Sequence, residues 1–198
     1  MDKPANTDLP LHPLIRDRHS PRAFADAPVA AADLTLVFEA ARWAASCFND
    51  QPWRFIVATR DEPEAHAKIA ACLFETNRAW ASAAPVLMIC AAKRTFSMNG
   101  NENAHARHDL GLAMGNMTLQ AGALGLALHM MGGIDRDAAR EAFAIPDDFD
   151  VVSGVALGYP GDPASLPAAL AERERAPRSR KPLDELVFTD TWGAARRA

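Results

Sequence analysis

The chain has 198 residues, of which 49% are hydrophobic, and its formal net charge is −4. A chain of this length can bury about 70% of its unfolded surface, so we expect a sizeable core. The acidic net charge argues against a general nucleic-acid-binding surface, which would be basic. The apolar runs are far shorter than the roughly 20 residues of a membrane span, and residues 1–13 lack an apolar stretch of the signal-peptide type. We therefore expect a cytoplasmic protein with no nucleic acid or membrane as partner.

The cysteines and histidines do not predict a metal site. Cys47, Cys72 and Cys90 are too far apart for a zinc motif, and their odd number favours free thiols in a reducing compartment. His105 and His108 are three positions apart on a predicted helix, but no third ligand with suitable spacing accompanies them.

The predicted elements alternate between helices and strands along the chain. Apolar spacing, prolines and acidic first turns predict helices over residues 11–15, 30–45, 64–73, 105–128, 135–143 and 166–175. Strands are predicted over residues 53–58, 86–92 and 151–159. Segment 86–92 is continuously apolar, which is typical of a central strand covered on both faces. Residues 160–198, rich in Pro, Arg and Ala, predict an extended C-terminal arm, and no linker divides the single domain of residues 1–198.

The helix predicted over residues 105–128 is apolar nearly all round. Leu110 and Met114 belong to one apolar stripe, and Leu112 belongs to another. Such a helix is buried either in a large core or in an obligate interface. Because a chain of this size has a limited interior, we expect a dimer interface, with Asp109 as an acid on the helix surface or in that interface.

The segment Arg18-His19-Ser20-Pro21-Arg22 gathers two guanidiniums, an imidazole and a hydroxyl. Pro21 disfavours the α conformation at Ser20, so the segment is predicted to be a loop. Guanidinium groups match phosphate bidentately, which favours an anionic ligand over the alternative of a solvated basic loop. A second basic cluster, Arg178-Ser179-Arg180-Lys181, precedes the apolar run of residues 186–188.

Three further motifs are candidates for binding a ligand. Ser46-Cys47-Phe48-Asn49-Asp50-Gln51-Pro52-Trp53 lies between a predicted helix and a predicted strand, and the alternative is a plain helix end before a strand that Pro52 delimits. Asn77 precedes the strand at residues 86–92, although an Asn alone is more often a turn or cap residue. Gly132-Gly133 allows a backbone N–H to approach a planar ring, and the alternative is a simple turn.

With these motifs the chain resembles the FMN-dependent nitroreductase family from about Leu14 to about Val187. The match in Asn-x-Gln-Pro-Trp over residues 49–53 is fairly specific. The chain departs at Ala45, where proline is frequent, and at Cys47, where serine is frequent and a thiol is a weaker donor. The resemblance implies an α+β fold with a nitroreductase-like mixed sheet flanked by helices. It also implies an intertwined homodimer in which residues 160–198 wrap onto the partner and extend its sheet.

The resemblance further implies how FMN would be held. Arg18, Ser20 and Arg180 would bind the phosphate, and Arg22 would lie near N1 and O2, where a cation favours the reduced flavin. Ser46, Cys47 and Asn49 would reach the flavin from the partner subunit. Asn77 would read the pyrimidine edge, and the Gly132-Gly133 backbone would approach N5 and O4. The full implied set is Arg18, His19, Ser20, Arg22, Ser46, Cys47, Asn49, Asn77, Gly132, Gly133, Arg178 and Arg180.

The activity implied by the resemblance is ping-pong hydride transfer from NADH or NADPH, through flavin N5, to planar acceptors such as nitroaromatics and quinones. No side chain is expected to act as an acid or base. The alternatives are a related flavin enzyme that dehalogenates aromatics or fragments its flavin, and a flavin-binding or sensor protein without turnover. The third alternative is an unrelated α/β binding protein whose basic loops hold a phosphate group other than that of FMN. The sequence does not determine the physiological acceptor or the preferred nicotinamide cofactor.

Overall fold

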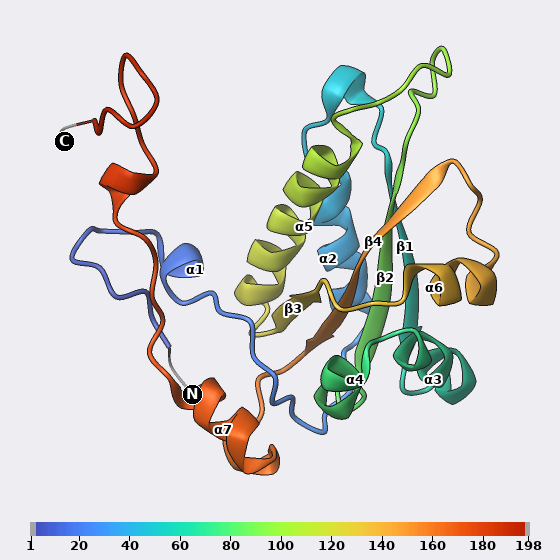
Figure 1. Cartoon of the computed structure of the whole chain (residues 1–198). Coiled ribbons are helices and arrows are strands. Elements are labelled where there is room, and N and C mark those ends of the chain that lie inside the picture. Colours follow the sequence, from blue (N-terminus) through green and yellow to red (C-terminus); the bar gives the residue numbers. More distant parts are fainter. Residues whose placement is uncertain (1–2, 197–198) are drawn as a thin grey trace.

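The computed structural model describes residues 3–196 and consists of one sheet between two layers of helices (Figure 1). The strands are β1 (Trp53–Thr59), β2 (Val86–Lys93), β3 (Ala127–Met131) and β4 (Phe149–Gly158), in the order β1-β2-β4-β3. The helices are α1 (Pro13–Arg16), α2 (Ala31–Arg42), α3 (Pro63–Ala71), α4 (Glu75–Ala81), α5 (Ala106–Ala123), α6 (Arg136–Phe143) and α7 (Ala168–Arg175). Short 3-10 turns lie at η1 (Cys47–Asn49), η2 (Pro163–Ser165) and η3 (Leu183–Glu185).

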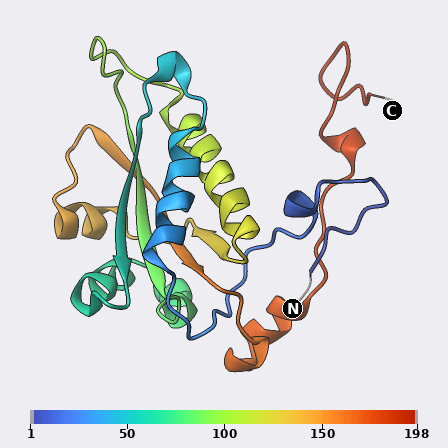
Figure 2. The same ribbon diagram turned by 180° about the vertical axis from the view of Figure 1, so that it is seen from behind.

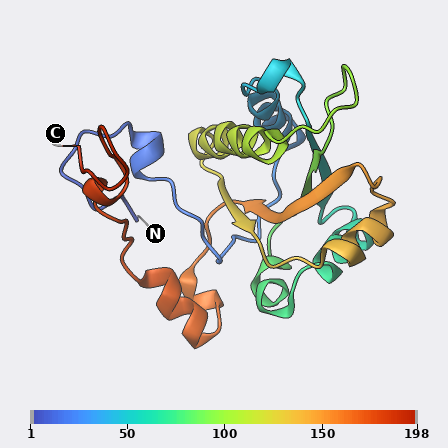
Figure 3. The same cartoon turned by 45° about the horizontal axis from the view of Figure 1, so that its top comes forward.

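The two layers of helices pack on opposite faces of the sheet (Figure 3). On β2, Val86 and Met88 belong to the cluster formed with α2 and α5, whereas Leu87 and Ile89 belong to the cluster formed with α3, α4 and α6. Successive side chains of a strand point to opposite faces, so β2 contributes to both cores. Every residue from 86 to 92 is buried, which confirms the prediction of a central strand covered on both faces.

The strand directions correct one expectation. The three pairings β1–β2, β2–β4 and β3–β4 are all antiparallel. The α+β architecture with flanking helices is confirmed, but the expectation of a mixed sheet is wrong for the sheet that residues 3–196 form. A strand covered on both faces is continuously apolar whichever way its neighbours run, so the apolar run at β2 did not reveal their direction.

The helix expected over residues 105–128 is also shorter than predicted. α5 ends at Ala123, and the chain turns at Gly125, whose φ of +73° suits a residue without a Cβ. The Leu126 N–H then donates to the Ala121 carbonyl at 2.8 Å, and β3 begins at Ala127. Apolar residues run through both α5 and β3, so the apolar spacing extended the predicted helix into the strand. The helix α4 was not predicted from the sequence. No helix within residues 3–196 has the length and hydrophobicity needed to cross a bilayer.

The two ends of the described chain lie side by side, away from the sheet (Figure 2). Arg178 ties them together, because its Nη1 donates to the carbonyls of Lys3 and Arg16, both at 2.7 Å. The C-terminal segment exposes apolar side chains: Leu183 is 61% exposed and Trp192 is 93% exposed. These side chains are therefore free to pack against another surface.

Candidate functional site

The arginine segment, residues 18–22, lies beside the C-terminal end of α5 and the strand β3. Arg18 Nη1 donates to Ser20 Oγ at 3.1 Å. A cavity of about 280 Å³ opens beside Arg18 and His19, and Thr118 and Gly122 of α5 line its other side. The predicted loop thus presents Arg18 and His19 at the edge of an open cavity.

The basic residues at the two ends of the chain come together here. Burial, followed by the charges of Arg178 and Arg180, lowers the pKa of Arg18. Burial and Arg180 likewise lower the pKa of Arg178, against the opposing effect of Asp17. Within residues 3–196, none of these three arginines forms a salt bridge. An anion placed among them would relieve the repulsion between the three guanidiniums.

Arg178 differs from the other two arginines in its role. Its Nη1 is already used by the Lys3 and Arg16 carbonyls, so it joins the two ends of the chain as well as adding charge. Arg180 is exposed and donates only to the neighbouring Ser179 carbonyl. Arg180 is therefore better placed than Arg178 to turn its side chain toward a ligand.

Asn77 and the two glycines meet at the end of β3. Asn77 Nδ2 donates to the Gly133 carbonyl at 3.0 Å, and the Phe74 N–H donates to the same oxygen at 3.1 Å. A Cβ on Gly133 would lie 2.6 Å from Asn77 Nδ2, whereas a Cβ on Gly132 would meet nothing within 4 Å. The loop is therefore closely packed on one side and open on the other.

Substituting Gly133 by Ala should displace the Asn77 side chain and break its hydrogen bond. Because the clash is with the end of a flexible side chain, we expect a modest loss, about 1 kcal/mol of unfolding free energy. Gly132→Ala is the matched control and should leave stability within about 0.5 kcal/mol. Urea unfolding of the two variants measures both losses, and equal losses in the two would contradict the packing described.

The Ser46–Trp53 segment is held by a different set of contacts. Ser46 Oγ accepts from the Gln51 N–H at 3.0 Å, and the Cys47 N–H donates to Asp109 Oδ2 at 2.9 Å. Asp109 is only 2% exposed, so the expectation of an acid on the helix surface is wrong: the carboxylate is buried under this loop. Helical position alone could not show that a loop covers it.

The same segment has an unusual backbone. Phe48, Asn49 and Gln51 have φ values of 53°, 54° and 51°, a region that costs non-glycine residues energy. Backbone strain of this kind persists when surrounding contacts enforce it and is frequent at functional sites. Phe48 is 77% exposed, and its ring lies against that of Phe96 in an edge-on contact.

Asp109→Ala should loosen this loop, since it leaves the partly buried Cys47 N–H without its acceptor. We expect a loss of about 1–3 kcal/mol in unfolding free energy, measured by urea denaturation. His108→Ala provides the comparison. His108 Nδ1 lies 3.1 Å from Asp109 Oδ1, but its side chain is 69% exposed, so its removal should cost much less. A larger loss in His108→Ala would refute this assignment.

The structure does not bring the Ser46–Asn49 group together with the arginine segment. Cys47 contacts Asp109 in the first turn of α5, whereas the cavity beside Arg18 reaches Gly122 in its last turn. These helix positions are about 13 residues apart, roughly 20 Å at 1.5 Å per residue. Figure 1 shows η1 and the arginine segment at opposite ends of α5.

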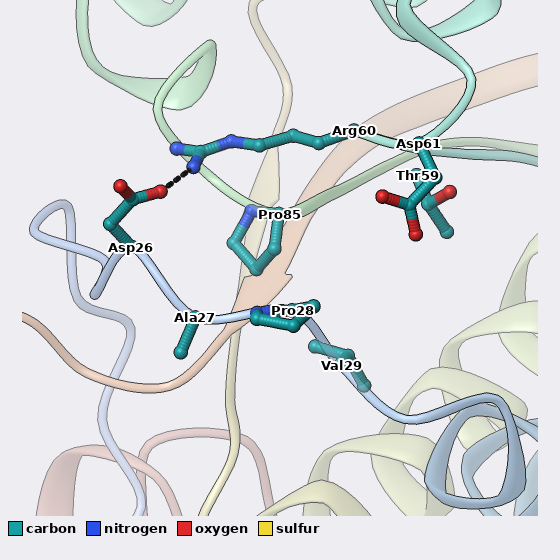
Figure 4. Close-up of a pocket in the computed structure, with 8 residues that line it drawn as sticks. All are labelled: Asp26, Ala27, Pro28, Val29, Thr59, Arg60, Asp61 and Pro85. Carbon is teal, nitrogen blue, oxygen red and sulfur yellow. Dashed lines mark hydrogen bonds and ion pairs between the residues drawn. The ribbon is translucent and has the colours of Figure 1, made fainter.

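A separate pocket of about 220 Å³ lies at the C-terminal end of β1, near the start of α2 (Figure 4). Arg60 spans it and forms an ion pair with Asp26, while also donating to the Ala83 carbonyl. None of the site residues expected from the sequence lines it.

Sequence analysis missed two residues that contact the arginine segment. His129 Nδ1 and the Pro21 carbonyl are 2.8 Å apart, and the His129 ring lies 4.5 Å from that of Trp80. Glu174 on α7 is 3% exposed and accepts from the Arg22 N–H. Its neighbours in the sequence are charged, so Glu174 looks like part of a solvated helix face. No local pattern signals its burial.

The fold and the site together define an α+β protein with a cluster of arginines beside an antiparallel sheet. The model of the Nitroreductase family matches residues 15–159. The chain therefore belongs to the nitroreductase family.

Individual proteins agree with this assignment. A protein of Stenotrophomonas maltophilia (strain K279a) named "Putative NADH dehydrogenase/NAD(P)H nitroreductase" is 33% identical over 174 residues, which are 79% of this chain and 87% of that protein. A crystal structure of an oxidoreductase containing FMN is 38% identical with a TM-score of 0.90, and the match covers 96% of each chain. A nitroreductase family protein from Clostridium difficile 630 is 27% identical with a TM-score of 0.69, covering 90% of this chain and 96% of that one.

Proposed function

We propose that this chain is an FMN-dependent oxidoreductase that works as a homodimer. The observation that carries the proposal is that Arg18 donates to the Ser20 hydroxyl at 3.1 Å while lying within reach of the charges of Arg178 and Arg180, with no salt bridge to any of the three arginines within residues 3–196. Guanidinium and hydroxyl donors are the groups that bind a phosphate. A solved relative with 38% identity contains FMN, and the phosphate of FMN fits this set of donors.

The other residues that this chain would contribute to the FMN site fit a flat ring system. Gly132 has open space where a side chain would be, and Asn77 is held beside it by the Gly133 carbonyl. Arg22 would place a positive charge near the ring, which favours a reduced flavin. Bound FMN would supply the hydride chemistry that couples oxidation of NADH or NADPH to reduction of a planar nitroaromatic or quinone.

The separation of the two motif groups supports a site built by two chains. The Ser46–Asn49 loop and the arginine segment lie at opposite ends of α5. A two-fold axis across α5 would reverse the second copy and bring its Ser46–Asn49 loop toward the arginine segment of the first. Leu112, 41% exposed on α5, and the exposed apolar side chains of the C-terminal segment offer surfaces for this contact.

An anaerobic visible spectrum of the purified protein supplied with FMN tests the proposal. We expect a protein-bound flavin spectrum that bleaches when NADPH or NADH is added and returns when a quinone is supplied. Bound flavin that neither donor bleaches would favour a flavin-binding protein without turnover. Failure to take up FMN would overturn the proposal and favour a different phosphate ligand.

A further inference from the structure

The peptide group between Pro21 and Arg22 is held from both sides. Its carbonyl, on Pro21, accepts a hydrogen bond from His129 Nδ1 of β3 at 2.8 Å. Its N–H, on Arg22, donates to both carboxylate oxygens of Glu174 of α7, at 3.1 and 3.2 Å. A peptide group is planar, so these two partners together determine its orientation and the direction in which the Arg22 side chain leaves the backbone.

Glu174 also acts on the charge of Arg22. Its Oε2 lies 3.8 Å from Arg22 Nη1, and the side chains are 4% and 29% exposed, respectively. A charge pair shielded from water interacts more strongly than one on the surface. The carboxylate therefore offsets part of the positive charge that Arg22 presents to its surroundings.

His129 contributes position rather than charge. Burial is the main cause that lowers the pKa of His129, with Arg22 and Arg18 also lowering it and the Pro21 hydrogen bond and Glu174 opposing. The ring is then neutral at pH 7, and its proton is on Nδ1 because a carbonyl oxygen can only accept. Trp80 packs against the ring at 4.5 Å and restrains it.

We propose that Glu174 and His129 are positioning residues that clamp the Pro21–Arg22 peptide, and that Glu174 sets the effective charge of Arg22 at the flavin. The second part rests on the proposed function, because it needs a flavin beside Arg22. The clamp itself does not. A full positive charge at this position would stabilise reduced flavin strongly, and the buried carboxylate moderates that effect.

Three variants separate position from charge. Glu174→Gln keeps an oxygen that accepts from the Arg22 N–H but removes the negative charge. Glu174→Ala removes both. Glu172→Gln is the matched control, because Glu172 is exposed on the same helix.

Hydrogen exchange at the Arg22 amide of the flavin-free protein tests the clamp. We expect exchange to be at least about tenfold faster in Glu174→Ala, which corresponds to the loss of one hydrogen bond of about 1.4 kcal/mol. The exchange rate of the Arg22 amide in Glu174→Gln should be close to that of the wild-type protein, and the rate in Glu172→Gln should equal it. Unchanged exchange in Glu174→Ala would overturn the clamp, whether or not the protein binds flavin.

The flavin midpoint potential tests the charge role. In Glu174→Gln we expect the reduced flavin to gain about tenfold in affinity relative to the oxidised flavin, a rise of about 30 mV for a two-electron couple. Glu172→Gln should leave the potential unchanged. An unchanged or lower potential in Glu174→Gln would overturn the charge role. If the wild-type protein binds no FMN, the proposed function and the charge role both fail, while the exchange experiment still decides the clamp.

Discussion

Replacing Arg18 with alanine should weaken FMN binding at least about tenfold. Arg18 is partly buried, and its Nη1 already lies 3.1 Å from the Ser20 hydroxyl. A charge-assisted hydrogen bond contributes about 1.5–3 kcal/mol, which is roughly 10- to 150-fold in Kd. Titration of the flavin-free protein with FMN, followed by flavin fluorescence, measures the effect.

Arg173→Ala is the matched control for Arg18→Ala. Arg173 lies on α7 and is exposed, so its removal changes the net charge by the same amount without touching the cluster. We expect its FMN affinity to stay within about twofold, since an exposed charge is screened by water and salt. Equal weakening in the two variants would mean that general charge, rather than a phosphate site at Arg18, governs binding.

The second large effect concerns a site shared between two chains. Arg18→Ala and Asn49→Asp should each bind FMN poorly. Arg18→Ala removes a proposed ligand of the phosphate, and Asn49→Asp adds a negative charge to the loop that the second chain contributes to the site. Asp tolerates the φ of 54° at this position about as well as Asn. Mixing the two variants and allowing subunits to exchange should restore about a quarter of the sites, because half of the dimers are mixed and each contains one intact site.

A second mixture provides the control for this experiment. Arg18→Ala mixed with Arg180→Ala should restore nothing, because the charge of Arg180 acts on Arg18 within one chain and both residues belong to the same half-site. Restoration in this control would contradict the assignment of Arg18 and Arg180 to the same chain of one site. No restoration in the first mixture would contradict the shared site, and each FMN site would then have to be built by a single chain.

The sequence predicted structure best where a single short segment contained all the residues on which the prediction depends. The seven residues of segment 86–92 are apolar and all buried, as a strand covered on both faces requires. The arginine segment was predicted to be a loop from Pro21, and no regular element occupies it in the structure. By contrast, apolar residues continued past Gly125, so the end of α5 and the presence of β3 were not readable from periodicity.

The sequence by itself determined the family, the α+β class and the residue types that a phosphate and a flat ring require, because these depend on local composition and short motifs. Only the tertiary structure decided strand direction, the burial of Asp109 and Glu174, and the grouping of Arg18 with Arg180. It also placed the Ser46–Asn49 loop at the far end of α5 from that group. Such facts depend on contacts between residues far apart in the chain, and packing and electrostatics across those contacts leave no local pattern in the sequence.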